Sequence, residues 1–272
     1  MNNKIDLHFE SYGSGSPILM LHGFGSFLFT WRHLVPVLRD TNKLFLVDLK
    51  GFGKSPKPKD NHYRVQDQAD LVHQFIVQQD LHQLTLIGHS FGGAVALFVS
   101  LMLAKEKSDR LSKLVLIDSA GYRQDLPTFI EILRLPIIGP IAFLLLSNEQ
   151  KTRLALNKSF FDDTKVTGDM ARTYAEPLGK DGAKHALFRT AETMIPPDLD
   201  QIIRQYSLIV VPTLIIWGRN DEVIPLKVGE RLHQAIINSE LTIIDKCGHN
   251  PQEEKPIETI EVLCSFLQRV EK

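Results

Sequence analysis

The stretch from residue 84 to 104 constrains the fold of this chain more than any other. A mostly apolar run, residues 84–87, ends at Gly88, and an almost wholly apolar segment extends from Ala94 to Ala104. This pattern predicts a buried strand, a very tight turn and a buried helix. Glycine stands two residues before and two residues after Ser90, because a turn this sharp strains the serine backbone and leaves no room for neighbouring Cβ atoms.

The turn carries a G-x-S-x-G motif as Gly-His-Ser-Phe-Gly at residues 88–92. In a strand-turn-helix context this is the pattern of a nucleophile elbow. We expect the Ser90 hydroxyl to stand clear of the backbone at the positive end of the following helix. The alternative is a glycine-rich turn with an incidental serine, so the functional interpretation requires a base, an acid and an oxyanion hole elsewhere.

Composition places the chain among ordinary globular proteins. It has 272 residues, 43% of them hydrophobic and 23% charged, which fits one large α/β domain or a core with an insertion. A net charge of −1 gives no indication of a nucleic-acid partner. Two cysteines do not make a disulfide framework, and the first ten residues lack the apolar core of a secretory signal, so we expect a cytoplasmic protein.

Short strands alternate with helices at both ends of the chain. Besides the strand before Ser90, strands are predicted at 5–11, 17–21, 43–48, 113–118, 213–217 and 241–245, and helices at 29–38, 66–80 and 226–237. A final helix is predicted to carry one apolar face of Ile257, Ile260, Leu263, Leu267 and Val270. This alternation predicts a mostly parallel sheet with helices on both faces.

The middle of the chain has a different character. Residues 122–208 are punctuated by prolines and contain no convincing strand, so they are predicted to form a helical lid inserted into a core of residues 1–121 and 209–272. The longest apolar run, 135–146, is broken by Pro136, Gly139 and Pro140 and is too short to span a bilayer. We therefore expect no stable membrane insertion, while contact of this run with lipid stays open.

His249 is the predicted base. It lies in a loop directly after the predicted strand 241–245, and sites form in the loops at the carboxyl ends of strands in open α/β sheets. Other histidines lie in predicted helices, beside Ser90 on the elbow, or in the loop after the second strand, where a bracing role is expected: His73, His185, His233, His89 and His22.

Asp221 is the predicted acid, in the loop after the predicted strand 213–217. Its role would be to hold one imidazole tautomer and to stabilise the imidazolium without taking the proton. Asp118, at the end of the preceding core strand, and the adjacent Glu222 are alternatives. Asp221 could also serve only as a turn or helix-cap residue.

The chain order Ser90, Asp221, His249 matches the serine–acid–histidine order of α/β-hydrolases. Over essentially its full length the sequence resembles that superfamily, in its serine carboxylesterase or lipase-like branch, through motifs at 22–25, 48–55, 88–93, 217–221 and 248–249. The resemblance implies an α/β-hydrolase fold with a helical lid. It also implies an oxyanion hole formed by the backbone N–H groups of Phe24 and Phe91.

The serine at position 90 argues against the dehalogenase and epoxide hydrolase branches, which use an aspartate nucleophile. Carbon–carbon bond hydrolases of ring-cleavage (dienoate) products keep the triad and a similar lid. They usually carry Asn where His89 stands and Trp where Asn250 follows the histidine, so they are retained as an alternative. A non-catalytic ligand-binding protein is a further alternative, although such proteins typically lose a triad member.

We therefore expect hydrolysis of carboxylic esters with short-to-medium acyl chains through an acyl-enzyme. The substrate is expected to be a small hydrophobic ester, because the predicted lid is rich in apolar side chains. The candidate pocket residues are Phe129, Phe143, Phe161, Met170, Phe188 and Met194. No metal, cofactor or nucleic acid is expected, and the sequence does not indicate an oligomeric state.

Overall fold

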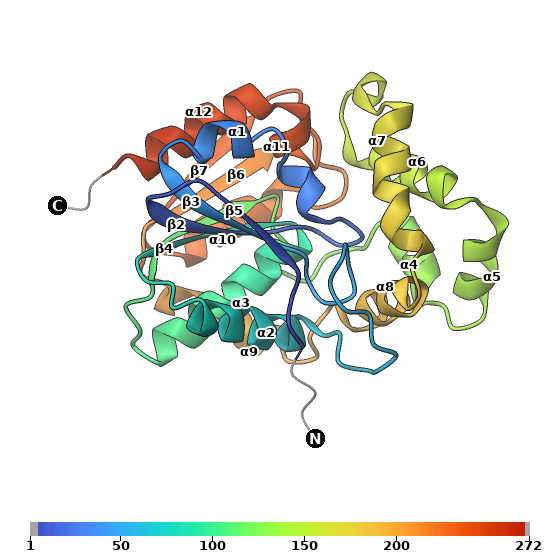
Figure 1. Ribbon diagram of the computed structural model, residues 1–272, viewed down its shortest axis with the longest axis horizontal. Helices are drawn as coiled ribbons and strands as arrows, with labels where there is room; N and C mark the ends of the chain where they lie inside the picture. The colour runs from blue at the N-terminus through green and yellow to red at the C-terminus, as the bar shows by residue number, and fades with distance from the viewer. Residues whose placement is uncertain (1–4, 270–272) are drawn as a thin grey trace.

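The computed structural model describes residues 5–269, and a seven-stranded sheet runs through its centre (Figure 1). The strand order is β1-β3-β2-β4-β5-β6-β7, with β1 antiparallel to β3 and all other pairs parallel. The strands are β1 (Phe9–Tyr12), β2 (Ser16–Leu21), β3 (Asn42–Val47), β4 (Leu84–His89), β5 (Leu111–Ile117), β6 (Thr213–Gly218) and β7 (Ser239–Ile244). The predicted mostly parallel sheet is confirmed.

Helices cover both faces of the sheet. The core helices are α1 (Val35–Leu38), α2 (Val65–Gln78), α3 (Phe91–Lys105), α10 (Leu226–Ala235), α11 (Pro251–Glu254) and α12 (Pro256–Leu267). Between β5 and β6 lie α4 (Thr128–Arg134), α5 (Ile138–Leu145), α6 (Asn148–Ser159), α7 (Gly168–Ala175), α8 (Ala183–Thr193) and α9 (Leu199–Ile203). Short 3-10 helices are η1 (Leu28–Trp31), η2 (Asp163–Lys165), η3 (Glu176–Gly179) and η4 (Tyr206–Leu208).

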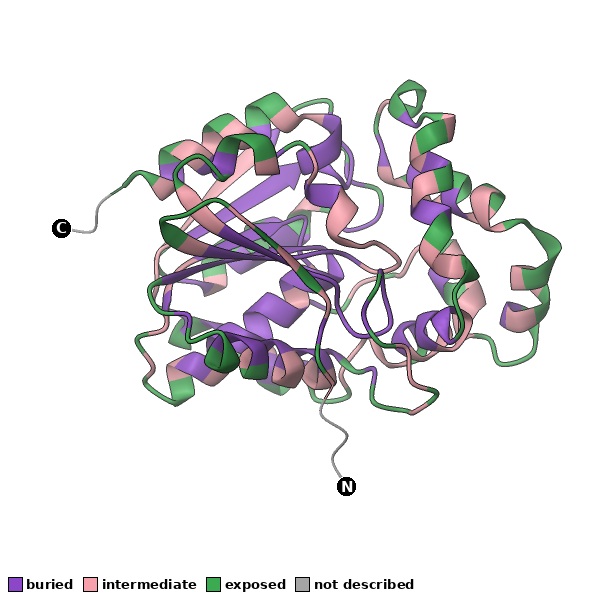
Figure 2. Cartoon of the chain, in the orientation of Figure 1, coloured by how far each residue is buried: buried purple, intermediate pink, exposed green. Residues whose placement is uncertain are grey.

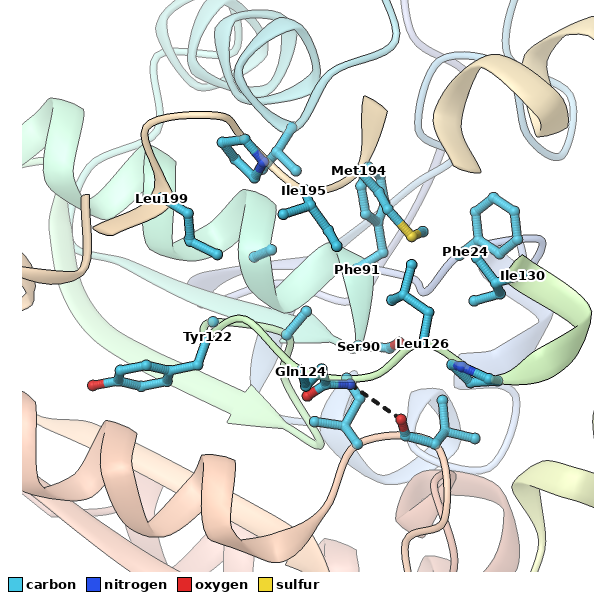
Figure 3. A pocket seen from close by; sticks show the side chains of 18 of the residues that line it. Phe24, Ser90, Phe91, Tyr122, Gln124, Leu126, Ile130, Met194, Ile195 and Leu199 are labelled. Carbon is cyan, nitrogen blue, oxygen red and sulfur yellow. Dashed lines mark hydrogen bonds between the residues drawn. The ribbon is translucent and has the colours of Figure 1, made fainter. Parts of the chain in front are cut away.

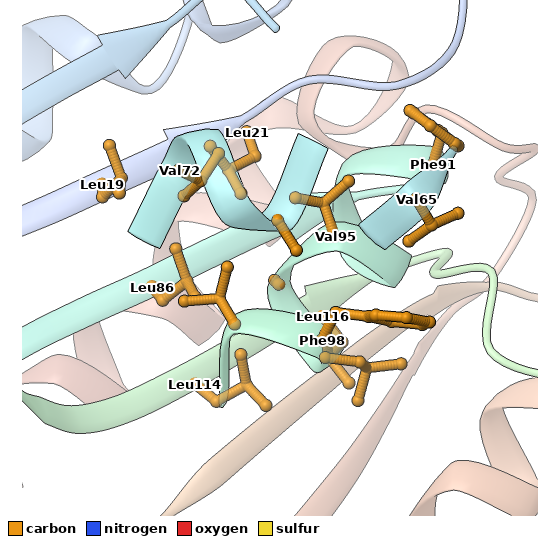
Figure 4. Packing of buried hydrophobic residues seen from close by; sticks show 14 of the residues in the cluster. Leu19, Leu21, Val65, Val72, Leu86, Phe91, Val95, Phe98, Leu114 and Leu116 are labelled. Carbon is orange, nitrogen blue, oxygen red and sulfur yellow. The ribbon is translucent and has the colours of Figure 1, made fainter. Parts of the chain in front are cut away.

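Alternate residues of the buried strands pack into two separate layers, because successive side chains of a strand point to opposite faces. Leu19 and Leu21 of β2 pack with α2, α3 and α10, whereas Ile18 and Met20 pack with α1 and α12. Figure 4 shows the first layer, in which Val72 of α2 and Val95 of α3 lie over the strands. Both faces of the central strands are therefore buried, as expected for a parallel sheet.

The predicted helix at 29–38 is wrong in its extent. The structure has the 3-10 helix η1 (Leu28–Trp31) followed by the short helix α1 (Val35–Leu38). Pro36 lies in the first turn of α1, where a missing backbone N–H costs nothing. In the interior of a longer helix the same residue would remove a backbone hydrogen bond. The helix therefore begins at Val35.

The apolar face predicted for the last helix is only partly correct. Leu263 is buried and Ile260 packs against the core, but Ile257 is 69% exposed in the first turn of α12. Val270 lies outside the described residues.

Residues 122–208 form helices and loops without a strand, as predicted, and we call them the helical segment. Figure 1 shows α4 to α8 gathered on one side of the sheet, beyond the carboxyl ends of the strands. Among residues 5–269, none of the helices combines the length and the apolar character that crossing a membrane would require.

Candidate active site

The turn between β4 and α3 holds Ser90 in a strained conformation, with φ 54° and ψ −119°. A Cβ on Gly88 would lie 2.4 Å from the carbonyl oxygen of Gly92, and a Cβ on Gly92 would lie 2.4 Å from the carbonyl oxygen of Leu21. Real Cβ atoms do not approach backbone so closely. The glycine spacing predicted for an elbow therefore has the steric cause expected from the sequence.

Three side chains that are far apart in the sequence form one hydrogen-bonded chain. The Ser90 hydroxyl donates to Nε2 of His249 at 2.8 Å, and Nδ1 of His249 donates to Oδ2 of Asp221 at 2.7 Å. All three residues are buried. Each one follows the carboxyl end of a parallel strand, β4, β6 or β7, so the sheet brings the three loops together.

Asp221 also has the turn role that the sequence left open. Its Oδ1 atom accepts hydrogen bonds from the amides of Val223, at 2.7 Å, and Ile224, at 2.9 Å. The two carboxylate oxygens therefore have separate partners, one in the turn and one on the imidazole. The turn bonds fix the carboxylate, and the carboxylate then fixes the orientation of the His249 ring.

The two alternative acids occupy different environments. Glu222 is exposed and forms an ion pair with Lys158, away from the imidazole. Asp118 is fully buried beside Asp221, and its Oδ1 accepts from the amide of Gly218 at 2.9 Å. Burial, and then the charge of Asp221, raises the pKa of Asp118 well above its ordinary value. Asp118 therefore lies beside the acid but forms no hydrogen bond with the imidazole among the described contacts.

Asp118, Asp221 and His249 each place one potential ligand atom within 4.8 Å of the other two. Such a trio has the chemistry of a metal site. However, the imidazole Nδ1 is engaged with Asp221, and one Asp118 oxygen is engaged with a backbone amide. Hydrogen bonding therefore accounts for the contact between His249 and Asp221, while Asp118 Oδ2 is buried without a hydrogen-bond partner among the described residues.

The predicted oxyanion donors flank the serine. Phe91 is the first residue of α3, and a Cβ on Gly23 would lie 3.1 Å from the Cβ of Ser90, so the loop containing Phe24 passes directly against the serine. His22 braces this loop as predicted, since its Nδ1 donates to the carbonyl of Gly23 at 2.8 Å. Within residues 5–269, neither the Phe24 nor the Phe91 amide donates to a protein acceptor, so both remain available to an oxyanion.

Ser90 lies between two apolar cavities. The smaller, of about 80 Å³, is bordered by Met194 and Leu126 (Figure 3) and lined mostly by other apolar side chains. The larger, of about 370 Å³, extends under α4, α5 and α6 and includes Phe129 and Phe143 in its wall. A volume of this size is typical of small-molecule sites. Of the six predicted pocket residues, Phe129, Phe143 and Met194 therefore line a cavity that contains Ser90.

The structure places the other three predicted pocket residues elsewhere. Phe161 is 49% exposed, and Met170 packs against a separate apolar cluster of α6 and α7. Phe188 packs edge-on against Phe143, with ring centroids 5.5 Å apart, behind the cavity wall. An apolar residue in the helical segment can either line the cavity or pack between helices. The sequence does not distinguish these two roles, because they depend on how each helix is oriented.

The sequence analysis missed the side chains that hold the His249 loop. His89 donates from Nε2 to the carbonyl of His249 at 2.7 Å, and burial, followed by repulsion from His249, holds the pKa of His89 well below its usual value. Glu254 accepts from the amides of Gly248, at 2.7 Å, and Asp162, at 2.8 Å. The adjacent Glu253 accepts from the hydroxyl of Tyr174 at 2.8 Å. One sequence feature could have indicated these contacts: two consecutive glutamates stand in the first turn of the helix that follows the histidine loop.

Comparison with known proteins decides the family. A family model described as the alpha/beta hydrolase fold matches residues 16–256. The chain belongs to this family. It is 30% identical to YugF, an uncharacterised hydrolase of Bacillus subtilis, over 97% of this chain and 95% of that protein.

Two further relatives illustrate the range of the α/β-hydrolases that this chain is similar to. A 2-hydroxy-6-oxo-2,4-heptadienoate hydrolase of Pseudomonas putida is 26% identical over 97% of this chain and 93% of that protein. The solved structure of the esterase EaEST of Exiguobacterium antarcticum has a TM-score of 0.81 at 23% identity, covering 97% of this chain and 96% of that one. The second likeness concerns the fold alone.

Proposed function

We propose that this hydrolase cleaves carboxylic esters of short-to-medium acyl chains through an acyl-enzyme intermediate on Ser90. The observation that carries the proposal is the continuous hydrogen-bonded chain from the Ser90 hydroxyl through His249 to Asp221, next to two apolar cavities. A serine hydroxyl needs such a base, and the base needs an orienting acid, before it can act as a nucleophile.

The proposed reaction has two steps. The Ser90 oxygen attacks the ester carbonyl carbon while His249 Nε2 takes the hydroxyl proton, and the imidazolium then protonates the departing alcohol oxygen. Water subsequently attacks the acyl-enzyme, gives a proton to His249, and releases the acid as the proton returns to the Ser90 oxygen. The amides of Phe24 and Phe91 stabilise the tetrahedral oxyanion, with each donor contributing about 2.7–4 kcal/mol.

The two cavities support a hydrophobic substrate with one small and one larger group. Because Ser90 lies at their junction, the scissile carbonyl would sit between them, with a short chain in the small cavity and the remaining group in the large one. The helical segment supplies most of the wall of the large cavity, which supports the proposed lid role. Exclusion of water beneath such a cover strengthens the electrostatic interactions of the site.

The test is release of p-nitrophenol from butyrate and octanoate esters, together with labelling by a fluorophosphonate probe. The wild-type protein is expected to turn over both esters and to be labelled at Ser90, and Ser90→Ala is expected to abolish both. An unlabelled wild-type protein would instead indicate a binding protein with an unactivated serine. Labelling without ester turnover would support Ser90 as the nucleophile but would contradict the proposal that the substrate is an ester of this kind.

Carbon–carbon bond hydrolysis is the second candidate, and the Pseudomonas putida relative favours it. Lys151 gives the large cavity a cation that would suit the carboxylate of a dienoate. His89 and Asn250, which also line this cavity, depart from the usual residues of that group. Loss of the absorbance of 2-hydroxy-6-oxo-2,4-heptadienoate, with little release of p-nitrophenol, would select this candidate over the esterase.

A further inference from the structure

The helix α5 (Ile138–Leu145) is apolar on both of its faces. Its inner face, with Ala142 and Phe143, forms part of the wall of the large cavity. No element between residues 5 and 269 covers its outer face, where Leu144 is 73% exposed and Leu145 is 76% exposed. A helix at the surface of a soluble domain normally turns polar side chains outward. We therefore expect the outer face of α5 to be covered by a binding partner.

The exposed side chains of this region form what we call the α5 surface. Its members are all aliphatic: Leu135, Ile137, Ile138, Ile141, Leu144 and Leu145. Figure 2 shows α5 exposed at the side of the molecule opposite the C-terminus. Protein-binding surfaces draw on Tyr, Trp and Arg for their main contacts. A purely aliphatic surface is instead suited to an environment of hydrocarbon chains, which have no hydrogen-bonding groups.

Of the cations next to the α5 surface, Arg134 is paired with Glu131 at 3.4 Å, whereas Lys151 and Lys184 are not paired with an acid among the described residues. Arg134 is the only charged residue between 132 and 148. Lys151 holds its Nζ 3.5 Å from the ring centroid of Phe143, and Nζ of Lys184 lies 5.7 Å from the same centroid. Within the part of the chain that the structure describes, neither lysine forms an ion pair with a carboxylate. Two neighbouring cations without acidic partners complement an anionic surface.

We propose that the α5 surface docks onto a bilayer that contains anionic phospholipid. The aliphatic side chains enter the acyl region, and Lys184, at the edge of this surface, lies near the headgroup phosphates. At about 1.5 Å per residue, the eight residues of α5 extend about 12 Å, so the helix lies in the interface and does not cross the roughly 30 Å hydrocarbon core.

Docking would bring the large cavity next to the lipid, because α5 separates the two. A hydrophobic substrate dissolved in the bilayer would then reach the cavity without crossing water. This consequence rests on the proposed function, but the docking itself does not. Vesicle binding can be measured without any turnover, so failure of one proposal is distinguishable from failure of the other.

The test is co-sedimentation of the full-length protein with vesicles of phosphatidylcholine alone or of phosphatidylcholine and phosphatidylglycerol at 7:3. The protein is expected to bind the mixed vesicles at least tenfold more strongly than phosphatidylcholine alone. The double variant Leu144→Ser/Leu145→Ser is expected to weaken this binding at least tenfold. The matched control is Ile237→Ser/Ile257→Ser, since these isoleucines are 73% and 69% exposed and lie outside the helical segment.

A second variant tests the charges. Lys184→Gln is expected to reduce binding to the mixed vesicles several-fold and to leave binding to phosphatidylcholine unchanged, and added salt should have the same effect. Thermal unfolding of each variant in solution establishes that it is folded. Equal binding by wild type and the leucine variant would overturn the proposal. So would sedimentation velocity showing a wild-type dimer that the leucine variant converts to monomer, because the occupant would then be a second copy.

Discussion

At the scale of single residues, two neighbouring acids show how environment determines role. Asp221 is buried, with one oxygen held by turn amides and the other by His249, whereas Glu222 is exposed and paired with Lys158. Their positions in the sequence differ by one, yet only Asp221 can orient the imidazole.

Asp221→Asn is expected to lower kcat for p-nitrophenyl butyrate by roughly 10⁴-fold, because an amide favours the wrong tautomer of His249. The matched control Glu222→Gln is expected to retain kcat within about twofold, since an exposed ion pair contributes little. Steady-state kinetics at pH 7 measure both. A large loss in Glu222→Gln together with a small loss in Asp221→Asn would contradict the assignment.

Asp118 makes the stability of the protein depend on pH. Its folded pKa is raised well above the ordinary value of 3.8, first by burial and then by Asp221. The folded protein therefore keeps a proton that the unfolded chain releases above pH 3.8. The stability from this group is present below pH 3.8 and is lost as the pH rises through the folded pKa.

Asp118→Asn is expected to flatten this decline, because the amide keeps the acceptor for Gly218 and carries no charge. From pH 5 to pH 8 the Tm of the variant should fall less than the Tm of the wild type. The difference should be about 2–4 °C for each kcal/mol by which the substitution reduces the loss of folding stability. Thermal unfolding followed by circular dichroism measures this difference. The control Asp109→Asn, whose side chain is 83% exposed, should follow the wild-type curve; parallel curves for all three proteins would disprove the prediction.

At the scale of elements, the loop that carries His249 is fastened to the helical segment. The amide of His249 donates to the carbonyl of Ser159 at the end of α6, at 2.6 Å. Glu254 of α11 accepts from Gly248 on one side and from Phe161 and Asp162 on the other. The position of the imidazole therefore depends on a contact between α11 and the end of α6.

Glu254→Ala is expected to destabilise the protein by about 2–3 kcal/mol, because it leaves three backbone N–H groups without their charged acceptor. It should also lower kcat by roughly ten- to a hundredfold through displacement of the imidazole. Urea unfolding and kinetics measure the two effects. The control Glu258→Ala, half-exposed on α12, should stay within about 0.5 kcal/mol of wild type. A destabilised variant with unchanged kcat would show that the tether does not position His249.

At the scale of the whole molecule, the two parts of the structure differ in how thoroughly they are buried. The strands β2, β4, β5 and β6 are covered on both faces, whereas α4 and α5 each bury one residue. Local opening requires least free energy where few apolar contacts are broken. The core and the outer helices of the segment should therefore open independently.

Hydrogen exchange followed by mass spectrometry is expected to show this difference. Peptides covering residues 128–146 should exchange within minutes at pH 7, while those covering β4 should stay protected for hours. Peptides of α6 should be intermediate, because its end is tied to the His249 loop. Equal protection of α5 and β4 would contradict the prediction.

The parts of the site that follow from local chemistry were predictable from the sequence. The glycines around Ser90, the loops after the strands and the acid–histidine order indicated the candidate nucleophile and base and a short set of candidate acids, because each depends on a residue type at a fixed distance from a strand end. The helix predicted at 29–38 was wrong in extent, since one proline in the first turn of α1 outweighed the apolar pattern. Three of the six predicted pocket residues line a cavity beside Ser90 and three do not, because hydrophobicity in a helix does not reveal which neighbour a residue faces.

The sequence alone determined the strand–helix alternation, the strained serine turn and the candidate nucleophile, base and acid, because these depend on side-chain period and on backbone sterics. Only the tertiary structure decided that Asp221 and not Asp118 bonds the imidazole, that Glu254 ties the histidine loop to α6, and that the outer face of α5 is left uncovered. These features depend on contacts between residues distant in the chain, and such contacts are set by how the sheet and the helices pack together.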